Sequence, residues 1–203
     1  MDEAPEFAPQ VLQTLRQPLE HGEVVLHRAA GAARYPARFQ LVMAANPCPC
    51  GNAVGKALTC TCSVPARRRY FARLSGPLLD RVDLQLEVHP VTRVDRVACP
   101  GEPRAVVAAR VAEARARAVR RLGGTGWRTN AEVSGRWLRS HGELRARGAL
   151  RRLDQTVDRG GLTLRGADRV LRVAWTLADL AGRQAPRAED LDEALTLRLR
   201  GAA

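Results

Sequence analysis

The spacing of apolar residues changes several times along the first hundred positions, and each spacing predicts a different element. Between 8 and 20, leucine and valine recur at helical intervals, and His21-Gly22 is typical of the end of a helix. Two short extended runs, at 23–28 and 34–38, lie on either side of an Ala/Gly-rich turn. This arrangement predicts a helix followed by a β-hairpin.

Two further runs predict strands. Residues 39–45 (FQLVMAA) are almost continuously apolar, which is typical of a strand buried on both faces. From 82 to 88 apolar and polar residues alternate, as in a strand with one buried face. Between these runs, a loop rich in cysteine and glycine spans 47–64, and Pro65 begins a short basic helix. The pattern predicts an α/β fold for this part of the chain.

The character of the chain changes after a linker at 91–101, because no strand pattern is found from Glu102 onward. We therefore expect an α/β domain over 1–100 and an all-α domain over 101–203. The helices expected in the second domain span 103–122, 143–159, 166–181 and 188–198.

Composition adds two constraints. The chain has 203 residues, of which 45% are hydrophobic, with no apolar run long enough for a membrane span and no signal segment, so we expect a cytoplasmic protein. The formal net charge is +12 and the sequence pI about 11.1, which favours a nucleic-acid partner. Almost all of this charge is arginine, and a GC-rich genome would produce the same usage.

Four cysteines form two closely spaced pairs, Cys48-Pro49-Cys50 and Cys60-Thr61-Cys62. In extended backbone, residues i and i+2 point to the same side, so two facing pairs would place four sulfurs around one Zn²⁺. The spacing departs from the usual C-x-x-C knuckle, and reduced thiols or a redox pair are the alternatives. Cys99 stands apart in the sequence and is expected to be an ordinary thiol.

Several polar residues occupy positions that suit a nucleotide site. Asp2 and Glu3 are adjacent acids that would hold Mg²⁺ and orient a water, although an exposed acidic pair is usually only solvated. Asn46 follows the apolar run and would reach a phosphate or water, although Asn-Pro is also a common turn. Arg81 is a candidate phosphate ligand, with a surface salt bridge to Asp80 or Asp83 as the alternative. Arg165, at the start of a predicted helix, is a second candidate, although a single arginine means little in a chain with so many.

Taken in order, these segments resemble the magnesium-chelatase-like AAA+ ATPases of the ComM/YifB type. The resemblance is carried by NPCPCG with its paired C-x-C motifs, by SGPLLDRVDL and by LTLRGADRVLRVAWTLADLAG, and it runs over essentially the whole chain. It implies a partial AAA+ (P-loop NTPase) core followed by a helical lid domain. It also implies a hexameric ring that uses ATP and Mg²⁺ to move DNA during branch migration.

The resemblance assigns roles to individual positions. Asp2 and Glu3 would be the Walker B acids, and Asn46 the sensor 1 residue. Arg81 would be the arginine finger that acts on the neighbouring subunit, with Arg73 as the second choice. Arg165 would be the sensor 2 residue at the start of a lid helix.

The remaining assignments concern DNA and zinc. Residues 24–36 would form a pre-sensor hairpin that contacts DNA, with His27, Arg28 and Arg34 as its nucleic-acid-binding residues. The four paired cysteines would form the zinc-finger-like insertion of the family.

One departure from the family is large. No segment matches the phosphate loop G-x-x-x-x-G-K-[ST], and the only lysine, Lys56, lies in Gly-Lys-Ala. We therefore expect the C-terminal part of such an ATPase, and we expect no ATP hydrolysis by the 203 residues alone. The rival interpretation is a non-catalytic, zinc-stapled DNA-binding or interaction module.

Overall fold

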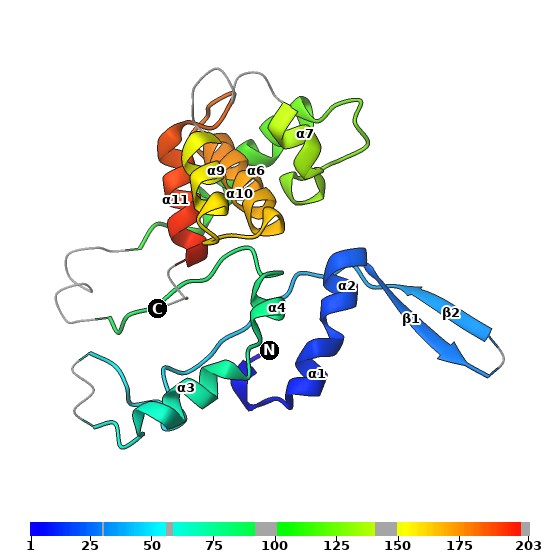
Figure 1. The fold of residues 1–203 in the computed structure, drawn as a ribbon. Helices are drawn as coiled ribbons and strands as arrows, with labels where there is room; N and C mark the ends of the chain where they lie inside the picture. The colour runs from blue at the N-terminus through cyan, green and yellow to red at the C-terminus, as the bar shows by residue number, and fades with distance from the viewer. Residues whose placement is uncertain (30, 56–58, 92–100, 141–149, 200–203) are drawn as a thin grey trace. The chain divides into compact units, whose positions relative to one another are not determined.

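The computed structural model describes residues 1–29, 31–55, 59–91, 101–140 and 150–199 (Figure 1). The chain divides into two compact units, Met1–Val82 and Asp83–Ala203, which are described separately. The domain boundary that we predicted near residue 100 lies at the edge of a stretch, 92–100, outside the described residues.

The first unit begins with three short helical segments: η1 (Ala4–Glu6), α1 (Pro9–Thr14) and α2 (Arg16–His21). The helix predicted over 8–20 is therefore present but interrupted at Leu15. The end of α2 follows the predicted rule, because Gly22 adopts a left-handed backbone (φ 68°) and its N–H donates to the Pro18 carbonyl.

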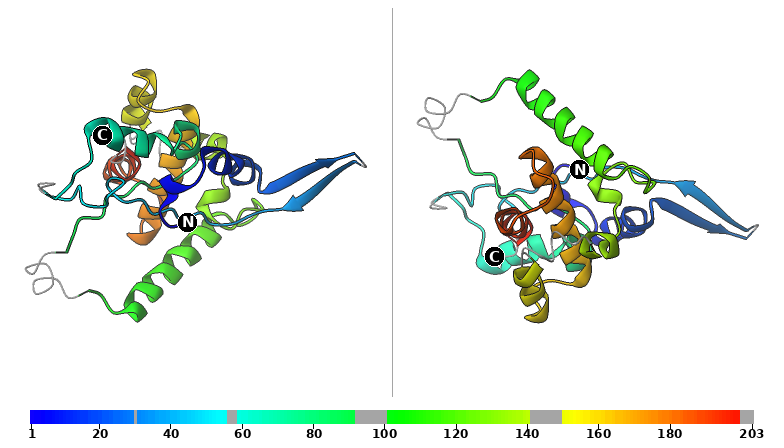
Figure 2. Two further views of the ribbon diagram at one scale, coloured as in Figure 1. Left: turned by 90° about the horizontal axis from the view of Figure 1, so that it is seen from below. Right: turned by 90° about the horizontal axis from the view of Figure 1, so that it is seen from above.

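The predicted hairpin is confirmed, and its second strand begins earlier than expected. Strands β1 (Glu23–Arg28) and β2 (Gly31–Pro36) are antiparallel, with Val25 opposite Arg34 and His27 opposite Ala32. The two strands extend from the end of α2 as a narrow arm (Figures 1 and 2). All of β2 is exposed, so neither face of this strand is covered by the rest of the unit.

Neither of the other two predicted strands is a regular strand in the structure. Residues 39–45 were expected to be buried on both faces, yet Phe39 is 48% and Val42 is 67% exposed. Apolar content shows where a strand would be stable, but burial requires neighbouring strands, and β1–β2 is the only sheet among the described residues. Residues 82–88 are also irregular, with Val88 86% exposed, and Gln85 donates its N–H to Leu197.

The first unit ends with α3 (Val64–Ala72) and α4 (Gly76–Leu79). As predicted, Pro65 lies in the first turn of α3, whose start is capped by the Ser63 hydroxyl accepting the Ala66 N–H. The core of this unit is small; its buried apolar members include Ala4, Leu12, Cys48, Tyr70 and Leu78.

All regular elements among the described residues of the second unit are helices. Its elements are α6 (Arg104–Arg121), η2 (Asn130–Glu132), α7 (Gly135–Ser140), α9 (Leu150–Asp158), α10 (Leu164–Leu180) and α11 (Ala188–Leu199). The helices predicted at 103–122, 166–181 and 188–198 are confirmed. The one predicted at 143–159 is present from Leu150, and its first part lies outside the described residues. The short elements η2 and α7 were not predicted.

Helix α10 is the centre of this unit. Its apolar face, which includes Val170, Leu171 and Trp175, lies in a core shared with α7, α9 and α11. A buried ion pair joins it to α6, since the 1% exposed Asp179 receives the Arg121 guanidinium, which also lies 4.3 Å from the Trp175 ring. Through its buried apolar face and its buried ion pair, α10 contacts α6, α7, α9 and α11.

None of the helices that the structure describes is long and apolar enough to cross a membrane.

Candidate functional site: an acid–amide edge beside a four-cysteine cluster

The first residues of the chain pair with the segment that precedes Asn46. The Met1 nitrogen donates to the Val42 carbonyl at 2.8 Å, and the Ala44 N–H donates to the Met1 carbonyl at 2.9 Å. One residue bonded to two partners that are two positions apart is the pattern of a parallel pair. A third bond, from the Ala4 N–H to the Ala44 carbonyl at 2.8 Å, continues the contact. The two segments therefore run in the same direction and end at the same edge.

This parallel pairing brings three predicted site residues to one end of the paired segments. Asp2 and Glu3 follow Met1 directly, and Asn46 follows Ala44 by two positions. All three are exposed at this edge. Carboxylates and an amide at the carboxyl ends of neighbouring parallel strands are placed as in nucleotide sites of open α/β folds. We call Asp2, Glu3 and Asn46 the acid–amide edge.

Glu3 has an uncommon backbone. Its φ of 49° and ψ of 44° make it the only non-glycine residue with positive φ among the described residues. Its N–H donates to the Asp2 carboxylate at 2.9 Å, which links the two acids. A left-handed conformation at a non-glycine residue has an energetic cost, and such residues cluster at functional sites.

Helix α3 packs against the acid–amide edge through two side chains. Tyr70 is 4% exposed; burial raises the pKa of its phenol, and a hydrogen bond from the Asn46 backbone lowers this pKa in part. Arg73 donates to the Pro5 carbonyl at 3.1 Å and to the Glu6 carboxylate at 3.3 Å. These contacts fix α3 to the segments that contain both the acids and the amide.

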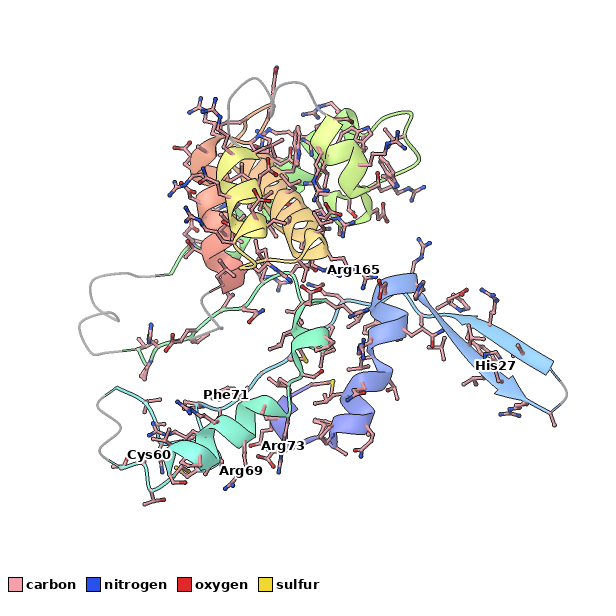
Figure 3. The ribbon with its side chains drawn as sticks, in the orientation of Figure 1. His27, Cys60, Arg69, Phe71, Arg73 and Arg165 are labelled. Carbon is pink, nitrogen blue, oxygen red and sulfur yellow. The ribbon has the colours of Figure 1, made fainter. Side chains whose placement is uncertain are left out.

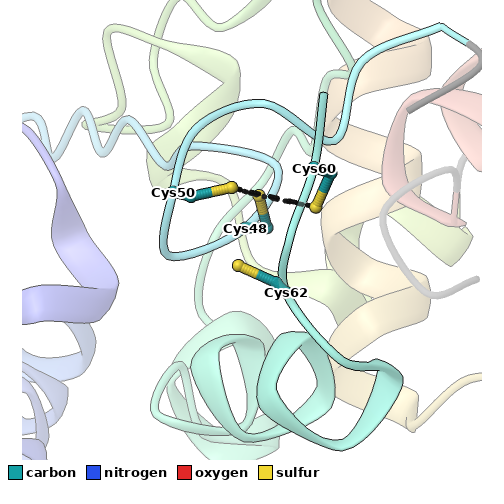
Figure 4. Close-up of side chains that lie close together, drawn as sticks. All are labelled: Cys48, Cys50, Cys60 and Cys62. Atoms are coloured by element: carbon teal, nitrogen blue, oxygen red, sulfur yellow. Dashed lines mark hydrogen bonds between the residues drawn. The ribbon is translucent and has the colours of Figure 1, made fainter. Parts of the chain in front are cut away.

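The four paired cysteines converge on one point (Figure 4). Their Sγ atoms all lie within 4.8 Å of one another, and the Cys48 sulfur is 3.3 Å from that of Cys50 and 3.7 Å from that of Cys60. Cys48 is buried, Cys60 and Cys62 are partly buried, and Cys50 is exposed. All four are free thiols in the structure. The predicted convergence of the two C-x-C pairs is thus confirmed.

Their mutual contact separates the thiol pKa values. A hydrogen bond from the Asn52 backbone, followed by one from the Cys48 thiol, lowers the pKa of Cys50 to about 6. The hydrogen bond with Cys50 is the main cause that raises the pKa of Cys62 to about 11. One thiolate is therefore stabilised by its neighbours, while a second deprotonation is opposed by the first unless a cation compensates the charge.

This donor set fits Zn²⁺. A tetrahedral site with Zn–S bonds of about 2.3 Å places its sulfurs about 3.8 Å apart, close to the Cys50–Cys60 distance of 3.8 Å. The cluster has four soft ligands and needs a cation to hold more than one thiolate, which suits zinc better than a hard metal. Cys48, Cys50, Cys60 and Cys62 would be its ligands.

The structure places Arg81, the candidate finger, in a largely buried position. Its side chain is only 10% exposed; two of its guanidinium nitrogens donate to the same carboxylate oxygen of Glu20 in α2, while a third reaches the Pro77 carbonyl at 2.7 Å. Of the two aspartates predicted as alternative partners, Asp83 pairs with Arg169 of α10 at 2.6 Å. The Glu20 contact fixes the guanidinium between α2 and α4.

The other two arginine candidates, which Figure 3 labels, are more exposed than Arg81. The Arg73 side chain is 46% exposed and is bonded beside the acids, as described above. Arg165 is exposed in the first turn of α10, whose start is capped by the Thr163 hydroxyl accepting the Gly166 N–H. A helix N-terminus favours a phosphate, and an arginine there adds a charge that matches it.

The hairpin residues predicted to contact nucleic acid, His27, Arg28 and Arg34, are all exposed. Arg34 pairs with Glu23 at 2.6 Å on the neighbouring strand. His27 lies on the same face as Arg34, since cross-strand partners share a face and alternate residues repeat it. Part of the Arg34 charge is therefore compensated within the hairpin.

Sequence reasoning missed two residues that organise this region. Glu20 carries no local signal, because an acid in a short amphipathic helix is usually only solvated. Tyr70 had a weak signal, since it is one of two tyrosines in a chain with 4% aromatics and stands beside three consecutive arginines. An isolated large aromatic residue in a polar helix often marks the face that is buried.

Comparison with known proteins gives a consistent result. The family model "Magnesium chelatase, subunit ChlI" matches residues 1–96, and "Magnesium chelatase, subunit ChlI C-terminal" matches residues 101–198. An uncharacterised protein of Mycobacterium tuberculosis is 48% identical over 202 residues, covering 100% of this chain and 40% of the relative.

Two other relatives match at lower identity. Competence protein ComM of Haemophilus influenzae and the uncharacterised protein YifB of Escherichia coli are each 38% identical over 201 residues, covering 98% of this chain and 38% of the relative. The chain thus spans about two fifths of the length of the curated relatives that it matches. It belongs to the magnesium chelatase ChlI family, together with ComM and YifB.

Proposed function

We propose that this chain carries the hydrolytic edge of an AAA+ ATPase of the magnesium chelatase type. The observation that carries the proposal is the parallel pairing of residues 1–4 with 42–44, which ends with two acids on one segment and an amide on the other. P-loop ATPases place their catalytic acids and their phosphate-sensing polar residue in this relation.

Within this proposal each residue of the acid–amide edge has a chemical role. Asp2 holds the Mg²⁺ of bound ATP, because a carboxylate oxygen is a preferred ligand of this ion. Glu3 orients the attacking water and accepts its proton. Asn46 holds that water or the γ-phosphate through its amide. The ATP-bound Mg²⁺ neutralises charge on the phosphates.

Two arginines complete the proposed site. Arg81 acts as the finger on the ATP of a neighbouring subunit, and the Glu20 pair keeps its guanidinium oriented until that subunit docks. Arg165 contacts phosphate from the start of α10. Arg73 is the second choice for the finger, but its contacts with Pro5 and Glu6 place it beside the acids of its own chain.

We propose DNA as the substrate on which the motor acts. The support is the net charge of +12, the exposed basic hairpin and the name of the Haemophilus relative, a competence protein. A hexameric ring would place one hairpin per subunit near a central channel, where Arg28 and Arg34 contact backbone phosphates and His27 lies beside them. Zn²⁺ bound by the four cysteines would staple the loop between Asn46 and α3.

A second function is favoured by one specific observation. The 203 residues contain no phosphate loop, yet they contain a complete four-thiol cluster and a basic hairpin. A zinc-stapled module that binds DNA without catalysis would need only these two features.

A hybrid protein separates the two functions. Residues 1–203 replace the matching part of the Mycobacterium tuberculosis relative, and steady-state ATP turnover is measured with and without Glu3→Gln. We expect turnover in the hybrid and a loss of about 100-fold or more in the variant, with nucleotide binding retained, because Glu3 acts on the water and not on ATP binding. A folded hybrid whose turnover does not depend on Glu3 would support the non-catalytic module.

A further inference from the structure

The cysteine cluster and the acid–amide edge are connected by two routes. Along the chain, Cys48 follows Asn46 by two residues and is fully buried. On the other side of the cluster, Cys62 is followed directly by Ser63, the cap of α3. The metal ligands therefore sit at the junction of the segment that carries the amide and the helix that packs against it.

Helix α3 returns to the edge from the cluster. Tyr70 is buried beside the Asn46 backbone, and Arg73 is bonded to Pro5 and Glu6, immediately after the acids. The cysteine cluster is thus joined to the acid–amide edge in two ways, along the chain from Cys48 to Asn46 and through α3, and both connections lie within the first unit. Without a metal, the cysteine pairs that begin these two connections would no longer be held together.

We infer that Tyr70 is a positioning residue through which metal binding at the four cysteines orders the acid–amide edge. Its side chain is buried and its hydroxyl is hydrogen-bonded by the Asn46 backbone, so that fixing the start of α3 at Cys62 fixes the edge. Such coupling requires only that the motion which separates the paired segments also separates the four cysteines. The inference rests on the proposed function for its importance to ATP turnover, but the coupling itself exists or fails without nucleotide.

Amide hydrogen exchange of the full 203-residue chain tests this coupling directly. Two reporters lie in the pairing itself: the Ala4 N–H, bonded to Ala44, and the Ala44 N–H, bonded to Met1. Two controls lie elsewhere: the Gly51 N–H, bonded to Cys48 inside the cluster loop, and the Ala37 N–H, bonded to Gly22 at the base of the hairpin.

Zinc is the probe, added to about 100 times its dissociation constant. If zinc must dissociate before a segment can open, zinc lowers the population of the open state by a factor of one plus its concentration divided by its dissociation constant. This factor is about 100 here, and amide exchange slows by the same factor. We expect this slowing at Ala4, Ala44 and Gly51, and none at Ala37. Slowing at Gly51 alone would show a local staple and overturn the inference.

Two substitutions then test the role of Tyr70. Tyr70→Ala should still bind metal at the cysteines, which is measured by the absorption of Co²⁺ bound to the thiols. Its zinc-dependent slowing of exchange at Ala4 should disappear to within about threefold. Tyr70→Phe keeps the buried ring but loses the hydrogen bond of the hydroxyl with the Asn46 backbone, so its slowing should lie between those of the wild type and Tyr70→Ala. Full slowing in the alanine variant would remove the assigned role. If that variant does not fold, the wild-type pattern decides the coupling, and Tyr70→Leu replaces it.

The two proposals can fail separately. A hybrid whose ATP turnover does not depend on Glu3 removes the catalytic function but leaves the exchange result unaffected. Absent coupling in the exchange experiment removes the positioning role while the Glu3 dependence stands.

Discussion

At the residue scale, the cysteine cluster shows how much a spacing pattern can establish. Two C-x-C pairs predicted four converging sulfurs, and the structure places them within 4.8 Å of one another. The burial of Cys48 and the lowered pKa of Cys50 depend on the loop path between the pairs, which the sequence does not specify. The donor set was therefore predictable, while its electrostatics were not.

We predict that the chain binds one Zn²⁺ and that Cys48→Ser abolishes tight binding, because a tetrahedral site loses a ligand and the remaining thiolates lose their shared cation. Elemental analysis of protein purified under reducing conditions measures the metal content. Cys99→Ser is the matched control and should retain a full complement. Equal zinc contents in the two variants would contradict the assignment.

Arg81 and Arg73 provide a second residue-scale comparison. The Arg81 side chain is 10% exposed in its pair with Glu20, whereas that of Arg73 is 46% exposed in its pair with Glu6. Leaving a partly buried carboxylate unpaired costs about 1–3 kcal/mol, whereas an exposed pair contributes about 0–1 kcal/mol. The difference in exposure therefore decides which arginine matters more for stability.

Urea unfolding of the first unit should show this difference. We expect Arg81→Ala to lower the free energy of unfolding by about 1–3 kcal/mol and Arg73→Ala by less than about 1 kcal/mol. Arg81→Lys should fall between wild type and Arg81→Ala, because it retains the charge but offers one nitrogen in place of the three that Arg81 uses. An Arg73→Ala effect as large as that of Arg81→Ala would mean that Arg81 is not the structural anchor.

At the scale of elements, patterns that depend on neighbouring residues predicted the structure correctly, whereas patterns that depend on pairing with distant segments did not. The helix-ending signal at His21-Gly22 and the two short extended runs around an Ala/Gly-rich turn predicted the end of α2 and the strands β1 and β2. The apolar runs at 39–45 and 82–88 predicted strands that are irregular, because a strand depends on partners far away in sequence. The three hydrogen bonds of Val42 and Ala44 with Met1 and Ala4 are the part of that pairing that the structure shows.

The hairpin has an internal ion pair that yields a directional prediction. Arg34 is held by Glu23, whereas Arg28 lies on the opposite face of the hairpin near its tip. Removing the acid leaves Arg34 available to a phosphate, so Glu23→Gln should increase DNA affinity, while Arg28→Ala should decrease it. Each phosphate contact changes the slope of log affinity against log salt by about 0.9.

Fluorescence anisotropy with a labelled duplex over a series of salt concentrations measures both effects. Arg152→Ala is the matched control, because it also removes one arginine from an exposed ion pair, but on α9. Equal slopes in all these variants would indicate a diffuse electrostatic attraction in place of a hairpin contact.

At the scale of the whole molecule, the chain is two separately packed units. The helical unit follows from amphipathic periodicity and was predicted almost completely where it is described. Only η2 and α7 were missed, because both are too short to show a period. Its relation to the first unit, like ring assembly, depends on surfaces whose partners no sequence pattern identifies.

Ring assembly gives a prediction for Arg81 that its structural role does not. In the hybrid, Arg81→Lys should retain folding and nucleotide binding but lose about 10³-fold in turnover, as for an arginine finger. Mixing it with the Glu3→Gln hybrid should recover activity, because mixed interfaces combine an intact Arg81 with an intact Glu3. A mixture no more active than the sum of its components would assign Arg81 a structural role only.

The central claim is that the two acids and Asn46 form one catalytic edge, and a double-mutant cycle in the hybrid tests it most directly. Turnover is measured for Glu3→Gln, for Asn46→Ala and for both together. Residues that act on the same water and phosphate are not additive, so the double variant should be about as slow as the slower single variant. If the two losses multiply, for example two 100-fold effects giving about 10⁴-fold, the residues act independently and the single-edge account is wrong.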